Sequence, residues 1–320
     1  MTKKIKRITS CLMILVLIGL MIGLNFRTPK VKADEASSSA SVTNALPVAS
    51  SVSIDSAAAS ITLTEATTKT VTATFTVTDD NGCEDIDSHA TNDTVAVLYR
   101  TNVTGGAGCT PDALNCYSMS CSQDAGSCTA GGADLAATYT CTASVQFYAD
   151  ATDAGTYITT DWTATATPRD NAGTDGTTAA DTIEMDTLTA LNVTTTIAYG
   201  ALALGANTTT TDQTTVVTNT GNNDPIDIQL DGYGATDGDG YSMTCTIGTI
   251  TIGNERYSLT AATDWSTKTQ LTDTAANVTT FDLAKGASST KNVYWGFGMP
   301  STGVGGSCTG KVNFTAITNI

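Results

Sequence analysis

Strict two-residue alternation is the feature of this sequence that most limits its fold. In KTVTATFTVT, residues 69–78, the Val, Ala and Phe side chains fall on one face and the threonines fall on the other. This alternation predicts a β-strand with one face against a core and one face in water. The segments DTVAVLYR (93–100) and TYTCTASVQFYA (138–149) repeat the pattern. Because no segment carries a long apolar stripe of helical period, the sequence predicts an all-β chain.

Threonine makes up 64 of the 320 residues, and β-branched residues suit a pleated, half-buried surface. Turn sequences such as DDNG (79–82) and PRDNAG (168–173) separate the strands. Further strands are expected at 157–167, 192–199, 214–219, 226–230, 242–247, 256–260, 278–283, 291–297 and 310–317. Short alternating strands with such turns predict antiparallel, immunoglobulin-like β-sandwiches. The strand pattern restarts near residue 190, so we expect two sandwiches in tandem, at 51–190 and 191–320.

The N-terminus has the pattern of a secretory signal peptide. Basic residues precede an apolar run from Cys11 to Leu24, and the sequence VKA ends at Ala33. This order predicts a leader at 1–33 that is cleaved on export. The alternative is a retained membrane anchor, because the apolar run can be extended to about the lower length limit for a membrane span. Residues 34–50 read as a flexible lead-in, and the expected location is secreted or on the cell surface.

Removal of the leader makes the chain strongly acidic. Seven of the 15 Lys and Arg lie in residues 1–33 and none of the 31 Asp and Glu do, which leaves 8 against 31, a net charge near −23. Nucleic acid and anionic lipid both require a positive protein surface. The charge therefore argues against nucleic acid as a partner, and it limits membrane contact to the leader.

Eight cysteines follow the leader, and their spacing favours disulfides over metal or redox chemistry. Zinc sites usually use two C-x2–4-C knuckles or histidines, and thioredoxin-type chemistry needs C-x-x-C; the chain has neither arrangement. An even number of cysteines in an exported chain predicts four disulfides. They would staple an excursion at about 101–137, which has almost no apolar residues of its own. The eight are Cys83, Cys109, Cys116, Cys121, Cys128, Cys141, Cys245 and Cys308.

The pairing of these cysteines is only partly defined by the sequence. Cys245 and Cys308 are alone in the second half and are expected to pair. The other six allow fifteen pairings. Cys83 can join Cys141 or reach into the excursion, and we expect the excursion cysteines to pair mostly among themselves.

Catalytic motifs are absent from the sequence, and we expect a protein that is not an enzyme and has no cofactor. The single histidine, His89, lies in the loop IDSHATND, and no nucleophile elbow, P-loop or zincin motif occurs. Calcium is the one metal hypothesis, because two acidic turns offer oxygen ligands, although Asp and Gly also simply form turns. Trp265 is the one aromatic side chain expected to be exposed for glycan binding. The candidate calcium ligands are Asp79, Asp80, Asp85, Asp231, Asp237 and Asp239.

Several motifs resemble secreted immunoglobulin-like surface proteins of uncultured bacteria, a functionally uncharacterised family. In the first half these motifs are VTDDNGCEDI, CTASVQFYADATDAGTY and WTATATPRDNAG, and in the second half IAYGALALGA, VVTNTGNNDPIDIQL, GNERYSL and KNVYWGFGMP. The resemblance covers roughly residues 52–317 and implies the fold and export, but no activity. More remotely, two β-modules behind an extended N-terminal strand resemble pilus subunits that lend such a strand to a neighbour.

Two functions follow as hypotheses. The first is a structural subunit of an extracellular filament or surface layer, which assembles by strand exchange or by surface association. Strand exchange would use residues 42–54 as the lent strand, whereas the alternative makes this segment the first strand of its own domain. The second hypothesis is a secreted adhesin module that binds carbohydrate or protein.

Overall fold

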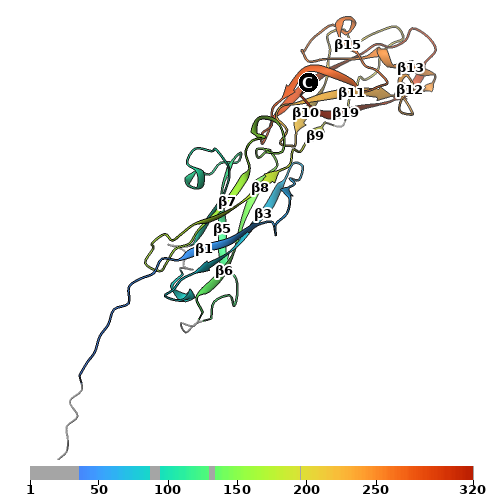
Figure 1. Ribbon diagram of the computed structural model, residues 1–320. Coiled ribbons are helices and arrows are strands. Elements are labelled where there is room, and N and C mark those ends of the chain that lie inside the picture. Colours follow the sequence, from blue (N-terminus) through green and yellow to red (C-terminus); the bar gives the residue numbers. More distant parts are fainter. Residues whose placement is uncertain (1–35, 87–93, 130–133, 195, 320) are drawn as a thin grey trace, which may run out of the picture. The chain divides into compact units, whose positions relative to one another are not determined.

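The structure is a computed structural model that describes residues 36–86, 94–129, 134–194 and 196–319 (Figure 1). Residues 1–43 and 44–320 are separate units by their internal contacts. The expected leader at 1–33 and His89 lie outside the described residues. The prediction of an all-β chain is confirmed: antiparallel sheets dominate, and the helical elements are five three-residue 3-10 turns within the described ranges. None of the described helices has the length and apolarity that a membrane crossing requires.

The first sandwich is a single eight-stranded sheet that folds around a core. Its order is β1-β3-β6-β5-β4-β7-β8-β2, and all pairs are antiparallel except β2–β8. The amide of Ala49 in β1 donates to the carbonyl oxygen of Thr177 just before β8, at 2.9 Å, so that β1 reaches the far end of the sheet. The strands are β1 (Val48–Ile54), β2 (Ser60–Ile61), β3 (Thr68–Thr78), β4 (Val95–Arg100), β5 (Cys116–Gln123), β6 (Ala136–Gln146), β7 (Trp162–Thr167) and β8 (Ala179–Met185).

The alternating apolar residues form the core of this sandwich. Leu98 and Trp162 are fully buried, and the rings of Phe75 and Tyr139 stack with centroids 5.6 Å apart. The indole Nε1 of Trp162 donates to the carbonyl oxygen of Asp150 at 2.8 Å, which satisfies its buried donor. The threonines of β3 face outward or are half-buried, as the alternation predicts.

The excursion at 101–137 differs from the expected loop, because it contains the strand β5, which lies between β4 and β6 in the sheet. Tyr117, Met119 and Cys121 are buried or half-buried, while the serines between them are exposed. The expectation that the excursion cysteines pair mostly among themselves is wrong. Only Cys109 and Cys116 do so, because β5 places Cys121 opposite Cys141 on β6, and Cys128 bonds to Cys83. The four disulfides are Cys83–Cys128, Cys109–Cys116, Cys121–Cys141 and Cys245–Cys308.

The lead-in is shorter than the sequence suggested. Residues 48–54 form β1 and pair with β3, so they belong to the first strand of their own domain. Asn44 Nδ2 donates to Asp170 at 2.6 Å, which attaches the chain to the same sandwich just before β1. A lent strand of residues 42–54 would require β1 to leave its sheet. A segment available for lending therefore ends near residue 43.

The second half contains three sheets: β15-β14-β17-β10-β9, β16-β11-β19 and β13-β12-β18. The core between the first two contains Trp295, Phe281 and Ile228, all fully buried. The indole Nε1 of Trp295 donates to Thr215 Oγ1 at 2.9 Å. The strands are β9 (Leu191–Val193), β10 (Gln213–Asn219), β11 (Ile226–Tyr233), β12 (Tyr241–Ile247), β13 (Thr249–Thr251), β14 (Glu255–Ser258), β15 (Thr269–Gln270), β16 (Ala276–Leu283), β17 (Thr290–Phe297), β18 (Gly305–Thr309) and β19 (Lys311–Thr318).

Candidate functional site

In the described structure β9 and β19 each end a sheet of the second sandwich and have one unpaired edge, as do β13, β15, β16 and β18. The strand expected at 192–199 ends at Val193, because the chain then leaves the sheet. In the described range 196–204, Ile197 and Tyr199 are half-buried between exposed neighbours, yet these residues belong to no strand. The side chains of Ile197 and Tyr199 pack against the core, while the outer edge of β19 has no hydrogen-bonded strand among the described residues.

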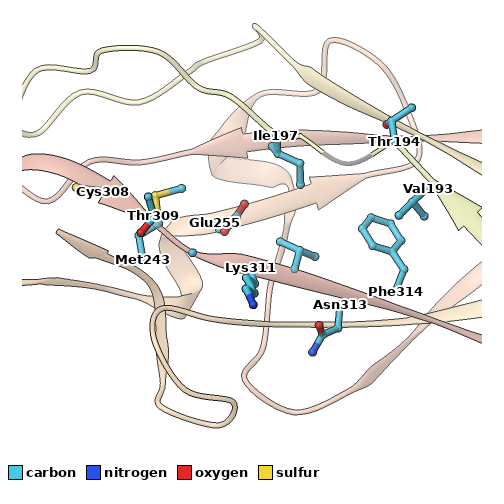
Figure 2. A pocket seen from close by; sticks show the side chains of 12 residues that line it. Val193, Thr194, Ile197, Met243, Glu255, Cys308, Thr309, Lys311, Asn313 and Phe314 are labelled. Carbon is cyan, nitrogen blue, oxygen red and sulfur yellow. The ribbon is translucent and has the colours of Figure 1, made fainter.

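A groove with a volume of about 530 Å³ lies between this segment and β19 (Figure 2). Val193 and Phe314 lie together at one end, and Ile197 projects into the groove from the upper wall in Figure 2. Met243 and Thr309 lie at the opposite end. The walls therefore combine apolar and polar side chains, and one wall is the free edge of a strand.

Glu255 supplies the acidic group of the groove. It lies on β14, is 3% exposed, and its Oε1 accepts a hydrogen bond of 2.8 Å from the Tyr199 hydroxyl. Burial raises the pKa of Glu255 to about 7, although the hydrogen bond from Tyr199 lowers it. Burial also raises the pKa of Tyr199 well above its usual value. The groove therefore contains a carboxyl group that is neutral in mildly acidic solution.

The end of the groove beside β18 is fixed covalently and by close packing. Cys308 lines the groove and is bonded to Cys245, its direct neighbour on β12. Gly310 separates β18 from β19, and a Cβ atom at this position would lie 1.8 Å from the carbonyl oxygen of Ser242. Only glycine fits at such a close approach of two backbones.

This arrangement is suited to binding an extended peptide. An unpaired edge strand offers backbone N–H and C=O groups to an added strand, and an adjoining groove accepts alternate side chains. Across the described ranges, no group of three or more His, Cys, Asp or Glu side chains is placed to hold a metal ion.

The first candidate calcium turn lies in the first sandwich, far along the chain from the groove. Asp79 is 1% exposed; its Oδ1 accepts from the Asn81 amide, and its Oδ2 has no hydrogen-bond partner. Burial raises the pKa of Asp79, and the carboxylates of Asp85, Asp170 and Asp80 raise it further. Calcium binding at Asp79, Asp80 and Asp85 stays a prediction. Melting curves recorded in calcium and in chelator test it, and identical curves would exclude it.

The second candidate calcium turn is held by its own backbone. The carboxylate of Asp239 accepts hydrogen bonds from four amides of the loop, including Ala235 at 2.7 Å and Thr236 at 3.0 Å. These bonds hold the pKa of Asp239 well below its usual value. Asp237 is exposed, and Asp231 accepts from Asn313 Nδ2 at 2.8 Å. The contacts of Asp239 are those of a turn-forming residue.

Trp265 is half-buried rather than exposed as expected. Its indole Nε1 donates to the carbonyl oxygen of Asn254 at 3.1 Å, and the guanidinium of Arg256 lies 4.2 Å from the ring centroid. The ring also packs against Gly298, where a Cβ atom would approach it to 2.4 Å. The role of Trp265 in ligand binding stays a prediction.

The sequence reasoning missed Glu255 and the open edge beside it. A signal for Glu255 was present, since Glu255, Tyr257 and Leu259 alternate with polar residues and so share one face of a strand. The open edge had no comparable signal, because alternation predicts an extended segment and not whether it finds a hydrogen-bonding neighbour.

Comparison with known proteins adds no family assignment: no protein-family model matches the chain, and no curated protein matches it.

Proposed function

We propose that the protein is exported after loss of residues 1–33 and serves as a non-catalytic, immunoglobulin-like structural subunit of an extracellular filament or surface layer. The observation that carries this proposal is the open groove of the second sandwich. Exposed edge strands are templates for pairing with another chain, and proteins that remain monomeric normally cover or shorten them. Here β19 has eight residues and a free outer edge in the described structure.

The disulfides support an extracellular role. Four disulfides are typical of proteins in oxidising compartments and are rare in the cytosol. They fasten the excursion of the first sandwich and one end of the groove in the second. A subunit that must stay folded outside the cell gains from covalent constraints of this kind.

The alternative function is a secreted module that binds carbohydrate or protein. The contacts of Trp265 favour the structural role, because its indole N–H and one face of its ring already have partners. Glycan-array binding that disappears in Trp265→Ala would instead support the alternative.

Electron microscopy and light scattering of the purified chain starting at residue 34 test the proposal. We expect ordered polymers whose abundance rises with protein concentration. A species that stays strictly monomeric over the whole concentration range would refute the structural role.

A further inference from the structure

We infer that the groove of one copy binds residues 36–43 of a second copy, ASSSASVT, as a strand added to the free edge of β19. This inference rests on the proposed function and names the contact by which the subunits join. It is carried by the shape of the groove, by the exposure and side-chain pattern of residues 36–43, and by the distribution of charge.

The acceptor side is the edge of β19 together with the groove that adjoins it. All eight residues of β19 pair with β11 on one side, and no described strand pairs with the other side. Val312 and Phe314 line the groove together with Lys311 and Asn313, whereas Thr315 is exposed and does not line it. An added strand would therefore bond to the backbone of β19 and place every second side chain over Val312 and Phe314.

The first sandwich shows how such an edge is covered within one sheet. There β1 pairs with β3 and also reaches Thr177 beside β8, so both ends of the sheet meet over the core. In the second sandwich the edge strand β9 has only three residues, and no described strand joins it to the outer edge of β19.

Residues 36–43 have the properties that an added strand requires. All eight are exposed, and Val42, at 85% exposure, is among the most exposed large apolar side chains in the structure. Ala36, Ala40 and Val42 fall on one face at even positions, whereas the odd positions hold only Ser and Thr. At about 3.4 Å per residue the segment extends for about 27 Å, which matches the eight residues of β19.

The distribution of charge along the chain also favours residues 36–43 as the added strand. The chain after the leader is strongly acidic, but residues 36–54 contain no charged side chain. An acidic segment would place its carboxylates in the groove beside the buried Glu255, at a cost in desolvation and repulsion. An uncharged strand of small side chains avoids both costs.

A labelled peptide of residues 36–43 tests the inference without altering the acceptor fold. The acceptor is the chain from residue 34 carrying Val42→Asp, which disables its own segment at an exposed position. We expect saturable binding, and binding of the Val42→Asp peptide that is weaker by about tenfold or more, because a carboxylate would enter the groove. The matched control peptide, Ser41→Asp, places its charge on the outer face and should change affinity by about twofold at most.

An acceptor that also carries Val312→Asp should no longer bind the peptide. An acceptor that instead carries Thr315→Asp, at an exposed position on β19, should bind it as before. Equal affinity for a scrambled peptide of the same composition would overturn the inference, and so would unchanged binding by the Val312→Asp acceptor. Polymers that still form from a chain starting at residue 44 would also overturn it, while leaving the structural function intact. Specific peptide binding by a chain that never polymerises would refute the structural function but retain the groove as a strand acceptor.

Discussion

Replacement of Glu255 by Gln is expected to remove one step from the pH dependence of stability. The folded state holds the pKa of this carboxyl at about 7, against an ordinary value of 4.5. As pH rises, the unfolded chain releases this proton first, so the contribution of Glu255 to the free energy of unfolding falls between pH of about 4.5 and about 7 and is constant outside that window. The pKa difference of about 2.5, at about 1.4 kcal/mol for each pKa unit, corresponds to a loss of about 3 kcal/mol.

Urea denaturation of the wild type and Glu255→Gln, followed by the fluorescence of the buried Trp295 at several pH values from 4 to 8, measures this difference. Every other titrating group is common to both proteins, so the gap between their curves reports Glu255. Tyr199→Phe provides a second variant: loss of the hydroxyl that bonds to the carboxylate should raise the pKa of Glu255 further and move the window to higher pH. Curves for the wild type and Glu255→Gln that run parallel from pH 4 to 8 would refute the reasoning.

Three further predictions concern the second sandwich and the disulfides. Thr215→Val should lower the free energy of unfolding by about 1–3 kcal/mol, because it leaves the buried indole N–H of Trp295 without an acceptor. The exposed control Thr214→Val should change it by less than about 0.5 kcal/mol in the same denaturation assay. Replacing both cysteines of the Cys245–Cys308 bond by Ala should lower the free energy of unfolding by about 4 kcal/mol, and the same change at Cys109–Cys116 should lower it by about 2 kcal/mol. The difference arises because the two bonds close loops with sequence separations of 63 and 7, and equal losses would contradict this chain-entropy argument. Gly310→Ala should destabilise the second sandwich and lower its calorimetric unfolding temperature, because a Cβ atom would overlap the Ser242 carbonyl oxygen. An unchanged unfolding temperature would show that the two backbones can separate.

The all-β architecture was predictable because its signal is local. Alternation over ten residues in β3 defines which face is buried, and the expected strand at 69–78 agrees with the observed Thr68–Thr78 to within one residue. The position of β5 was not anticipated, because the excursion was judged by its lack of aliphatic residues. Cysteines and Met119 take the place of aliphatic side chains there, and Tyr-Ser-Met-Ser-Cys-Ser alternates as strictly as any predicted strand.

The groove could not be predicted from the sequence because it depends on which strands become neighbours. The segment after Val193 has the alternation of a strand but no hydrogen-bonding neighbour among the described residues. Likewise, the raised pKa of Glu255 follows from its burial in the tertiary fold, where its hydrogen-bond partner is Tyr199, a residue distant in the sequence. Pairing and burial are properties of the tertiary fold, and a local pattern carries little information about either.

Amide hydrogen exchange along β19 measures most directly whether a second copy occupies the groove. The chain starting at residue 34 should protect the amides of 311–318 that do not bond to β11, and a chain starting at residue 44 should exchange them rapidly at the same concentration. Equal exchange of these amides in the two proteins would contradict the account.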